Sequence, residues 1–309
     1  MQTKALQAPV AFFVFRRPDT TRRVFEAIAK VRPSRLLLVA DGPRDGRAGE
    51  AEACEEVRKI VTHVDWPCEV TTNFADRNLG CGERVISGLN WVFSLVEEAI
   101  ILEDDCLPDL SFFPFCQELL ERYRGDCRIA SITGSNLGER YLKTEYSYFF
   151  SQLGGIWGWA TWKLQWQKFD RSLADWPTLK RENMLSEVFD HPRAVSYWTG
   201  VFNSMHDGTG PDTWDYQWFY SRLRNSALNI IPRVNMISNI GFGAGATHTV
   251  EPEPRVMPAL RTLDFPLRHP VSFVPLRSFD RHVLDLNVES ISRRISGKIR
   301  RLTNSFLSI

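Results

Sequence analysis

The most distinctive residues of the sequence are three adjacent acids, Glu103, Asp104 and Asp105, which directly follow the apolar run 99–102. Adjacent carboxylates repel one another, so such a group is costly unless water or a cation matches its charge. Hard divalent cations such as Mn²⁺ and Mg²⁺ prefer carboxylate oxygens and complete their coordination with waters and substrate phosphates. Because these acids end a strand-like run, they predict a metal and diphosphate site. The alternative is a solvated acidic loop.

A fourth carboxylate, Asp215, stands between large aromatic residues in the segment 214–218, Trp-Asp-Tyr-Gln-Trp. A carboxyl group among apolar rings is partly desolvated, and desolvation raises its pKa toward the range that suits a general base. The alternative is an ordinary acid in the first turn of a helix, where the helix dipole favours negative charge. We keep Asp215 as the candidate catalytic base.

Eight of the ten tryptophans lie in the segment 157–218. Flat aromatic rings can stack on the apolar faces of sugars, but three of these residues recur at spacings of three and four: Trp159, Trp162 and Trp166. That spacing predicts a helix with its aromatic stripe toward the core. We therefore expect only Trp157 and Trp214 to contact a ligand.

Other polar residues stand where strands are predicted to end. Arg16 and Arg17 follow the first apolar run and are suited to neutralise phosphate or to stack on a base; solvated surface charge is the alternative. Asp41 follows the second run and can accept hydrogen bonds from a nucleobase or ribose, or simply begin a turn. Arg77 and Asn78 open the turn before the next helix and are further candidates for nucleotide binding.

Two glycine-bearing segments add weaker signals. The turn 78–82, Asn-Leu-Gly-Cys-Gly, precedes a helix and so exposes backbone N–H groups that suit an anion, although it is neither a complete dinucleotide fingerprint nor a P-loop. The glycine-rich segment 241–245 leads to His248, a candidate metal or phosphate ligand. A lone histidine is more often structural.

The elements that must position these residues follow from hydrophobic spacing. Strands are predicted at 11–15, 36–40, 68–72 and 99–102, alternating with helices at 20–31, 48–61 and after the turn 78–82. Such alternation predicts an α/β fold, a mostly parallel sheet with helices on its two faces. Ligands of these sheets bind beyond the carboxyl ends of the strands, which is where the candidate residues stand.

The overall composition excludes several classes of protein. The 309 residues are 43% hydrophobic and 24% charged, an ordinary globular mixture, and 38 basic residues against 37 acidic ones give a net charge of +1. We therefore expect no nucleic-acid partner. No apolar run approaches the ~18 residues that span a bilayer. The first ten residues lack a signal-peptide pattern and the six cysteines lack metal-ligand spacing, so we expect reduced thiols and a cytoplasmic location.

The C-terminal part has a different character. Six of the 17 prolines fall between residues 252 and 275 and predict an extended strap. In the last twenty residues, apolar side chains recur at helical spacing while arginines and lysines occupy the other faces. This basic amphipathic helix, 289–309, is typical of membrane-surface contact. The alternative is docking onto the domain or onto a second subunit of a homo-oligomer.

The order of these motifs resembles the GT-A fold glycosyltransferases, in particular the N-acetylglucosaminyltransferase I type and its bacterial family-2-like relatives. The resemblance covers about residues 10–250. Its strongest pieces are Ile-Leu-Glu-Asp-Asp at 101–105 and Trp-Asp at 214–215, preceded or separated by strand-ending Arg and Asp residues and by Gly-Ile-Trp-Gly-Trp at 155–159. It implies one domain, 1–250, with a nucleotide-binding half (1–140) and an acceptor half (141–250), followed by the strap and helix of 251–309.

The resemblance also implies roles for the acids and basic residues. Asp105 would bind the Mn²⁺ (or Mg²⁺) that holds the donor diphosphate, while Glu103 and Asp104 would contact the donor sugar and ribose. Asp215 would be the catalytic base. The remaining implied contacts are to uracil by Asp41, to the nucleotide by Arg16 and Arg17, and to the metal or diphosphate by His248.

Two features depart from the family pattern. Trp157 stands where the relatives have a smaller aliphatic residue, which leaves the donor sugar open. The C-terminal strap and basic helix have no clear counterpart in the family.

The sequence thus predicts a metal-dependent, inverting glycosyltransferase that moves a sugar from a nucleotide-diphosphate donor, with UDP as the expected nucleotide, to a carbohydrate or glycolipid acceptor. A nucleotidyltransferase is one alternative, but such enzymes usually carry a glycine- and Lys/Arg-rich loop where this chain has Arg-Arg-Pro-Asp at 16–19. A non-catalytic nucleotide- or carbohydrate-binding protein on the same fold is the other.

Overall fold

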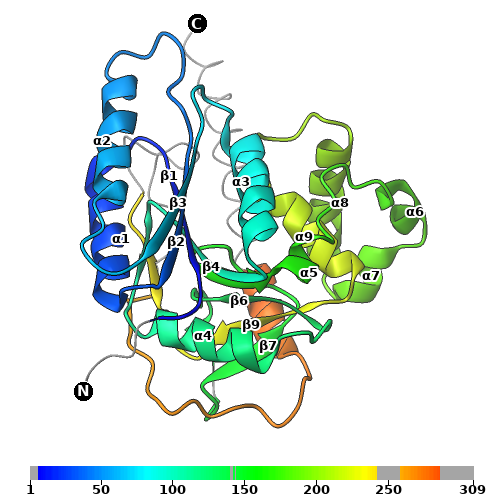
Figure 1. The fold of residues 1–309 in the computed structure, drawn as a ribbon. Helices are drawn as coiled ribbons and strands as arrows, with labels where there is room; N and C mark the ends of the chain where they lie inside the picture. The colour runs from blue at the N-terminus through cyan, green and yellow to red at the C-terminus, as the bar shows by residue number, and fades with distance from the viewer. Residues whose placement is uncertain (1–5, 140–141, 143, 242–257, 286–309) are drawn as a thin grey trace, which may run out of the picture.

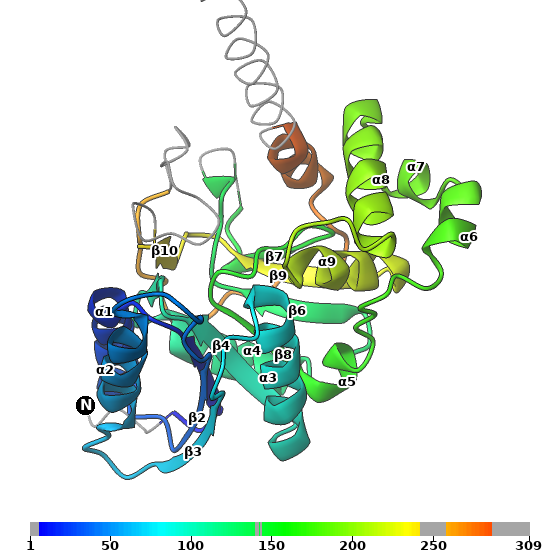
Figure 2. The ribbon, with the colours of Figure 1, turned by 90° about the horizontal axis from the view of Figure 1, so that it is seen from above.

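The computed structural model describes residues 6–139, 142, 144–241 and 258–285. Its centre is an eight-stranded sheet (Figures 1 and 2). In spatial order the strands are β3 (Glu69–Phe74), β2 (Arg35–Ala40), β1 (Val10–Val14), β4 (Glu98–Glu103), β8 (Trp159–Trp162), β6 (Ile129–Thr133), β9 (Leu228–Pro232) and β7 (Tyr148–Ser151). A second sheet pairs β5 (Cys106–Pro108) with β10 (Ile237–Asn239).

Helices lie on the faces of the large sheet or beside it. They are α1 (Pro18–Val31), α2 (Glu50–Thr62), α3 (Cys81–Leu95), α4 (Phe112–Arg122), α5 (Lys163–Trp166), α6 (Trp176–Arg181), α7 (Met184–Val188), α8 (Pro192–His206) and α9 (Asp215–Arg224). Four pairings of the sheet are parallel and three antiparallel among the described strands. The expected fold class, α/β with a mostly parallel sheet flanked by helices, is confirmed.

The alternation of side chains along β1 explains the two layers of helices. Phe12 points into a core shared with α1, α2 and α4, whereas Phe13 points into a second core shared with α3. Helices α1 and α2 accordingly lie on one face of the sheet and α3 on the other (Figure 2). A third core lies among α6 to α9, beside the sheet. No described helix is long and apolar enough to cross a membrane.

The register of the parallel strands places the candidate residues at one edge. Val14 of β1 pairs with Ala40 of β2, and Phe13 pairs with Glu103 of β4. The segments that follow β1, β2 and β4 therefore leave the sheet side by side. The expectation that Arg17, Asp41 and the acidic triplet lie at the same edge of the sheet is therefore confirmed.

The predicted tryptophan helix is wrong. Trp159 and Trp162 are the two ends of strand β8, and only Trp166 is helical, in the short α5. Residues three apart on a strand face opposite sides, so Trp159 joins the core under α3 while the Trp162 indole donates to the Leu120 carbonyl on the α4 side (3.1 Å). All three rings are buried, as expected for core residues.

The described part of the proline-rich strap, 258–276, contains no helix or strand. It is tied to the edge strand β7, where the Arg268 carbonyl accepts from the Ser147 amide (2.8 Å) and the Leu276 amide donates to the Phe150 carbonyl (2.8 Å). Residues 277–285 are helical. The predicted basic helix 289–309 lies outside the described residues.

Candidate functional site

The acidic triplet lies at the carboxyl end of β4 and contacts the segment that follows β1. The Phe15 amide donates to Asp104 Oδ2 (3.1 Å), which fixes that carboxylate against the backbone. Arg17 Nη1 donates to Asp105 Oδ2 (2.8 Å) and lies 3.5 Å from Asp104 Oδ1. Arg17 thus bridges the last two acids, at the point where α1 begins.

Negative charge exceeds positive charge in this cluster. Burial, and then repulsion from Asp105 and Asp104, raises the pKa of Glu103 to about 8. Burial and repulsion from Asp105 likewise raise the pKa of Asp104 to about 7, against the opposing effect of Arg17. The site is therefore suited to a ligand or ion that brings positive charge.

Asp215 lies within electrostatic range of this cluster although it is 110 positions from Asp105 in the sequence. It begins α9, is half-buried, and its carboxylate accepts a hydrogen bond from the Thr213 hydroxyl. Its charge is among those that raise the pKa of Glu103. The structure thus brings the candidate base and the acidic end of β4 together.

Trp214, next to the candidate base, is a correction to the sequence analysis. Its side chain is 2% exposed and stacks on Trp159, with ring centroids 5.6 Å apart. It packs in the core under α3 and so does not reach a ligand. Its contribution is to anchor the start of α9.

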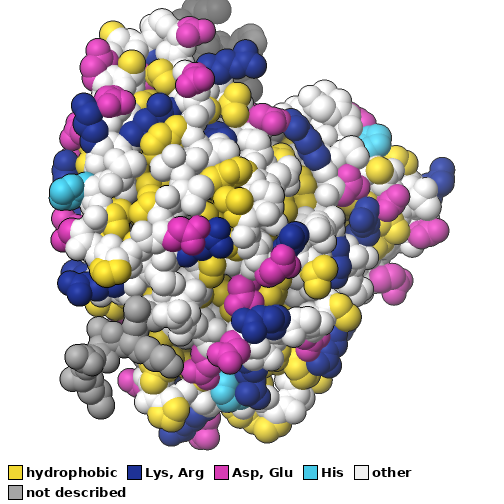
Figure 3. All heavy atoms as spheres, in the orientation of Figure 1, with side chains coloured by type: hydrophobic (Ala, Val, Ile, Leu, Met, Phe, Trp, Pro, Cys, Tyr) yellow, Lys and Arg dark blue, Asp and Glu magenta, His cyan; other side chains and the backbone are white. Residues whose placement is uncertain are grey.

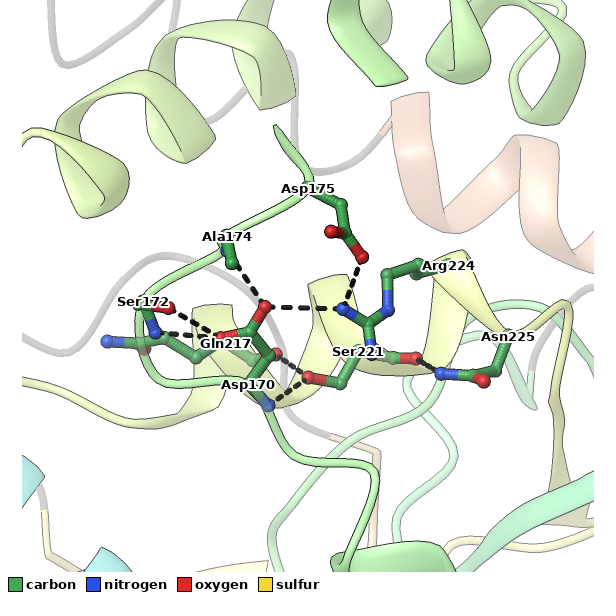
Figure 4. A network of polar contacts seen from close by, with 8 residues as sticks. All are labelled: Asp170, Ser172, Ala174, Asp175, Gln217, Ser221, Arg224 and Asn225. Atoms are coloured by element: carbon green, nitrogen blue, oxygen red, sulfur yellow. Dashed lines mark hydrogen bonds and ion pairs between the residues drawn. The ribbon is translucent and has the colours of Figure 1, made fainter. Parts of the chain in front are cut away.

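The rest of α9 is held by a polar network with the loop after α5 (Figure 4). The Asp170 amide donates to Ser221 Oγ (2.9 Å), and the Asp170 carboxylate accepts from the amides of Ser172 (3.0 Å) and Ala174 (2.8 Å). Arg224 bonds Asp170 Oδ2 (3.2 Å) and Asp175 Oδ2 (2.8 Å). These contacts fix the helix that presents Asp215.

Asp41 has a structural role in this structure. It is 6% exposed, and its Oδ1 accepts from the amides of Gly42 and Leu79 while its Oδ2 accepts from Asn78 Nδ2, each at 2.9 Å. Burial raises its pKa, in opposition to these hydrogen bonds. Asp41 and Asn78 therefore join the end of β2 to the turn before α3. Arg77, in that turn, is exposed.

The turn 78–82 does bind an anion, but the anion is part of the chain. Asp212 Oδ2 accepts from the Cys81 amide (2.9 Å) and Asp212 Oδ1 accepts from the Gly82 amide (3.0 Å). The predicted ligand position at the N-terminus of α3 is thus occupied by a carboxylate from the segment before α9. The sequence analysis recognised the amides and missed their partner.

A hollow rich in arginine adjoins the acidic cluster. It has a volume of about 570 Å³ and is lined by Arg16, Arg44, Arg47 and the start of α2. Glu50 fixes two of these side chains, at 3.2 Å from Arg16 Nε and 2.9 Å from Arg44 Nε. Arg16 and Arg44 also lie over the Phe15 ring. On the face shown in Figure 3, by contrast, acidic and basic side chains are interspersed.

Trp157 lies in the turn that leads into β8. Because β8 runs antiparallel to β4 with Trp159 opposite Ile101, the turn before Trp159 passes the acidic end of β4. Gly158 packs against Leu102 and Ile237. Trp157 is half-buried, and its predicted contact with the donor stays a prediction.

The late glycine-rich segment starts at the acidic cluster. The Ile240 amide donates to the Asp105 carbonyl (2.8 Å), and a Cβ added at Gly241 would collide with the Asp105 carboxylate. Only glycine fits this close approach. His248 lies outside the described residues.

The residues present can accommodate a divalent ion only together with a ligand. No group of three or more His, Cys, Asp or Glu side chains within the described residues is arranged to hold a metal ion. Mn²⁺ and Mg²⁺, however, are often bound through one or two carboxylates plus substrate phosphates. The surplus of carboxylates around Asp105 fits that mode.

Arg222 is a buried cation near Asp215 that the sequence analysis did not consider. It is buried, donates to Asn229 Oδ1 and to the Gly154 carbonyl (3.2 Å), and has its pKa lowered to about 9 by burial, which the charge of Asp215 opposes. Its spacing of seven from Asp215 places both on one face of α9. That spacing is the sequence pattern from which the proximity of Arg222 to Asp215 could have been predicted.

The chain is similar to solved structures at low sequence identity. No protein-family model and no curated protein matches the sequence. The chain is similar to the mannosyltransferase PcManGT from Pyrobaculum calidifontis, in complex with GDP-Man and Mn²⁺, at 12% identity and a TM-score of 0.38, over 72% of this chain and 70% of that one. It is also similar to a UDP-glucose pyrophosphorylase complexed with UDP-glucose, at 11% identity and a TM-score of 0.27, over 47% and 62%.

Both of these proteins are nucleotide-sugar enzymes by name, and neither is named as an N-acetylglucosaminyltransferase. At such identities and TM-scores the likeness carries no argument about activity or substrate. The proposal below therefore rests on the residues of this chain.

Proposed function

We propose that this chain is a nucleotide-sugar-dependent transferase of the GT-A type, specifically an inverting glycosyltransferase with Asp215 as its base. The supporting observation is the convergence of Asp215, the acidic end of β4 and Arg17 at one edge of the sheet. An acid cluster, a cation beside it and a separate carboxylate on a helix are the parts that such a transfer needs.

In this proposal the donor diphosphate lies at Asp105 and Arg17. Arg17 exchanges its contact with Asp105 for the donor phosphates, because a guanidinium binds phosphate oxygens as well as carboxylates. Asp105 would hold Mn²⁺ or Mg²⁺, and the ion, when bound, would supply Lewis-acid stabilisation to the departing diphosphate. The arginine-lined hollow at Arg16 and Arg44 is the nearest basic surface for the rest of the nucleotide.

Asp215 accepts the proton of the acceptor hydroxyl as its oxygen attacks the anomeric carbon. The new glycosidic bond forms on the face opposite the leaving group while the bond to the diphosphate breaks, so the configuration inverts. The nucleoside diphosphate leaves with the bonding electrons. The sugar product carries the acceptor oxygen.

The nucleotidyltransferase alternative is disfavoured by one observation. Strand β1 ends at Val14 and α1 begins at Pro18, so the three intervening residues Phe15, Arg16 and Arg17 leave no room for a glycine-rich triphosphate loop. If the chain is instead a non-catalytic binding protein, it binds a nucleotide but transfers sugar from no donor.

The testing experiment is thermal stabilisation by UDP, GDP, dTDP and CDP, each with and without Mn²⁺. A ligand that binds only the native state raises its stability by RT ln(1 + [L]/Kd), so the ranking identifies the donor nucleotide. We expect one nucleotide, with UDP first, to raise Tm in a Mn²⁺-dependent manner. No shift with any of the four would contradict the proposal.

The acceptor is proposed to be a carbohydrate or glycolipid, used at the cytoplasmic membrane surface through the basic segment 289–309. This part rests on the sequence alone. Flotation of the full chain with anionic vesicles tests it, with Arg293, Arg294 and Lys298 changed to Glu for comparison. Equal flotation of the two proteins would reject membrane contact through this segment and leave docking onto the domain or onto a second subunit.

A further inference from the structure

The segment that leads into α9 makes an unusual contact with α3. Residues 207–212 are largely exposed, yet Asp212 accepts from the Cys81 amide at 2.9 Å and from the Gly82 amide at 3.0 Å. The first amides of a helix have no partner within the helix, and the N-cap residue of α3 is Gly80, which has no side chain to supply one. Asp212 supplies the missing cap from 130 residues away.

The glycines of the turn are shaped around this carboxylate. A Cβ added at Gly80 would lie 2.5 Å from Asp212 Oδ2, and one added at Gly82 would lie 2.7 Å from Asp212 Oδ1 and 3.0 Å from the Thr213 carbonyl oxygen. All three distances are shorter than ordinary carbon–oxygen contacts. Glycine at these two positions thus permits the close approach of the 212–213 segment to α3.

This contact lies beside the candidate base. Thr213, adjacent to Asp212, donates its hydroxyl to Asp215. Cys81, whose amide Asp212 accepts, has its pKa raised to about 12 by burial and by the charges of Glu103, Asp212 and Asp215. The start of α3 is therefore the point at which the acidic end of β4 and the segment carrying the base meet.

We propose that Asp212 is a positioning residue: by bonding the first amides of α3, it holds the segment 212–215 so that the Asp215 carboxylate faces the acidic end of β4. The inference rests on the proposed function for Asp215. Asp212 does not touch the reacting atoms in this account. Its effect on rate arises because a base must lie within hydrogen-bond reach of its proton, and a shift of about 1 Å costs about 100-fold.

The first test is Asp212→Asn in the full chain. The amide group keeps the size of the side chain but offers one oxygen for two donors, so the segment loosens. We expect kcat for release of nucleoside diphosphate to fall about 10- to 100-fold, while the donor KM and the nucleotide-induced Tm shift stay unchanged. The matched control is Asp207→Asn, an exposed acid at the start of the same segment that pairs with His206; its kcat stays at the wild-type value.

The second test approaches the contact from the other side. Gly82→Ala adds a methyl group that must displace Asp212 and Thr213, although alanine is the better helix former. We expect kcat to fall without a matching loss of Tm. The control, Gly200→Ala in α8, adds the same group where nothing lies within 4 Å, and leaves kcat unchanged. A purely structural cap would lower Tm and leave the kcat of the folded enzyme intact.

The assays use UDP-glucose, UDP-N-acetylglucosamine and GDP-mannose as probes, with water or added saccharides as acceptors. Alkylation of Cys81 by iodoacetamide, mapped by mass spectrometry, gives a readout that needs no turnover. Asp212→Asn neutralises the charge near Cys81, and Gly82→Ala displaces it, so we expect both variants to lower the pKa of the Cys81 thiol and to speed its alkylation several-fold. Exposed Cys127 is the internal reference.

The outcomes separate the two proposals. If the wild type turns over and Asp215→Asn does not, but Asp212→Asn and Gly82→Ala keep kcat within twofold, the positioning role is overturned. If no probe is turned over by the wild type and none of the four nucleotides raises its Tm, the proposed function fails. Unchanged Cys81 alkylation in the two variants would overturn the docking of 212–215 on α3.

Discussion

Asp105 is contacted from two sides. Its Oδ2 accepts from Arg17 at 2.8 Å, and the chain at Gly241 passes directly against it. An ion that binds Asp105 must compete with Arg17, and a diphosphate resolves the competition because it offers Arg17 other oxygens. We therefore expect the metal and the nucleotide to bind cooperatively.

Asp105→Ala tests this coupling. Loss of the carboxylate removes the anchor for Mn²⁺, so we expect the Mn²⁺-dependent part of the nucleotide Tm shift to disappear while the shift without metal remains. Asp19→Asn is the control, because Asp19 is an exposed acid in the first turn of α1. A variant that keeps the full Mn²⁺-dependent shift would place the metal elsewhere.

At the residue scale, the sequence indicated which residues are candidates for the site better than it indicated which residues they contact. The acids, Arg17 and Asp215 were recognisable because strand ends and aromatic neighbours are local patterns. That Asp41 satisfies its own turn, that Trp214 stacks on Trp159, and that Asp212 caps α3 depend on contacts between residues far apart in the chain. No local pattern contains that information.

Among the elements, α2 is tied to the edge of the site by a buried carboxylate in its first turn. Glu50 is 5% exposed and is bonded by the amide and the guanidinium of Arg44. The guanidinium, through its hydrogen bonds, lowers the pKa of Glu50 to about 2. The pair fixes the arginine-lined hollow on one side.

The lowered pKa predicts a pH dependence of stability. A carboxyl group with a folded pKa below its unfolded value stabilises the fold above the unfolded pKa, and this contribution is lost as the pH falls from about 4.5 to about 2. Glu50→Gln should therefore lower the free energy of unfolding at pH 7 by about 1–2 kcal/mol, after allowance for solvent screening of the partly exposed Arg44.

Urea unfolding at pH 7, 4 and 3 measures this difference. We expect the gap between wild type and Glu50→Gln to narrow as the pH falls. Glu52→Gln, on the exposed side of the same helical turn, is the control. A gap that stays constant from pH 7 to pH 3 would show that Glu50 acts through packing and not through its charge.

At the element scale, the first half of the chain was predictable and the middle was not. Strands and helices up to residue 103 follow simple periods and appear within a few residues of their predicted bounds. Around Trp159 the chain is buried on both faces of the sheet, so every position is apolar or small and no period distinguishes a strand from a helix. The predicted helix carrying Trp159, Trp162 and Trp166 rested on their spacing alone, and for that reason the prediction was wrong.

On the scale of the whole molecule, the site exists because the sheet joins the two halves of the chain. Strand β8 inserts beside β4, and β6, β9 and β7 extend the sheet beyond it (Figure 2). The start of α9 is packed on β8 through Trp214 and on α3 through Asp212. Asp215, the proposed base from the second half, thereby lies near enough to acids from the first half to influence the pKa of Glu103.

The most direct test of the account is single-turnover and steady-state kinetics of Asp215→Asn with the sugar nucleotide that stabilises the wild type. Loss of a general base typically costs 10²–10⁴-fold in rate. We predict a fall of about that size in kcat, with nucleotide binding and its Mn²⁺ dependence unchanged. Near-wild-type turnover in Asp215→Asn would contradict the central claim that this carboxylate is the base.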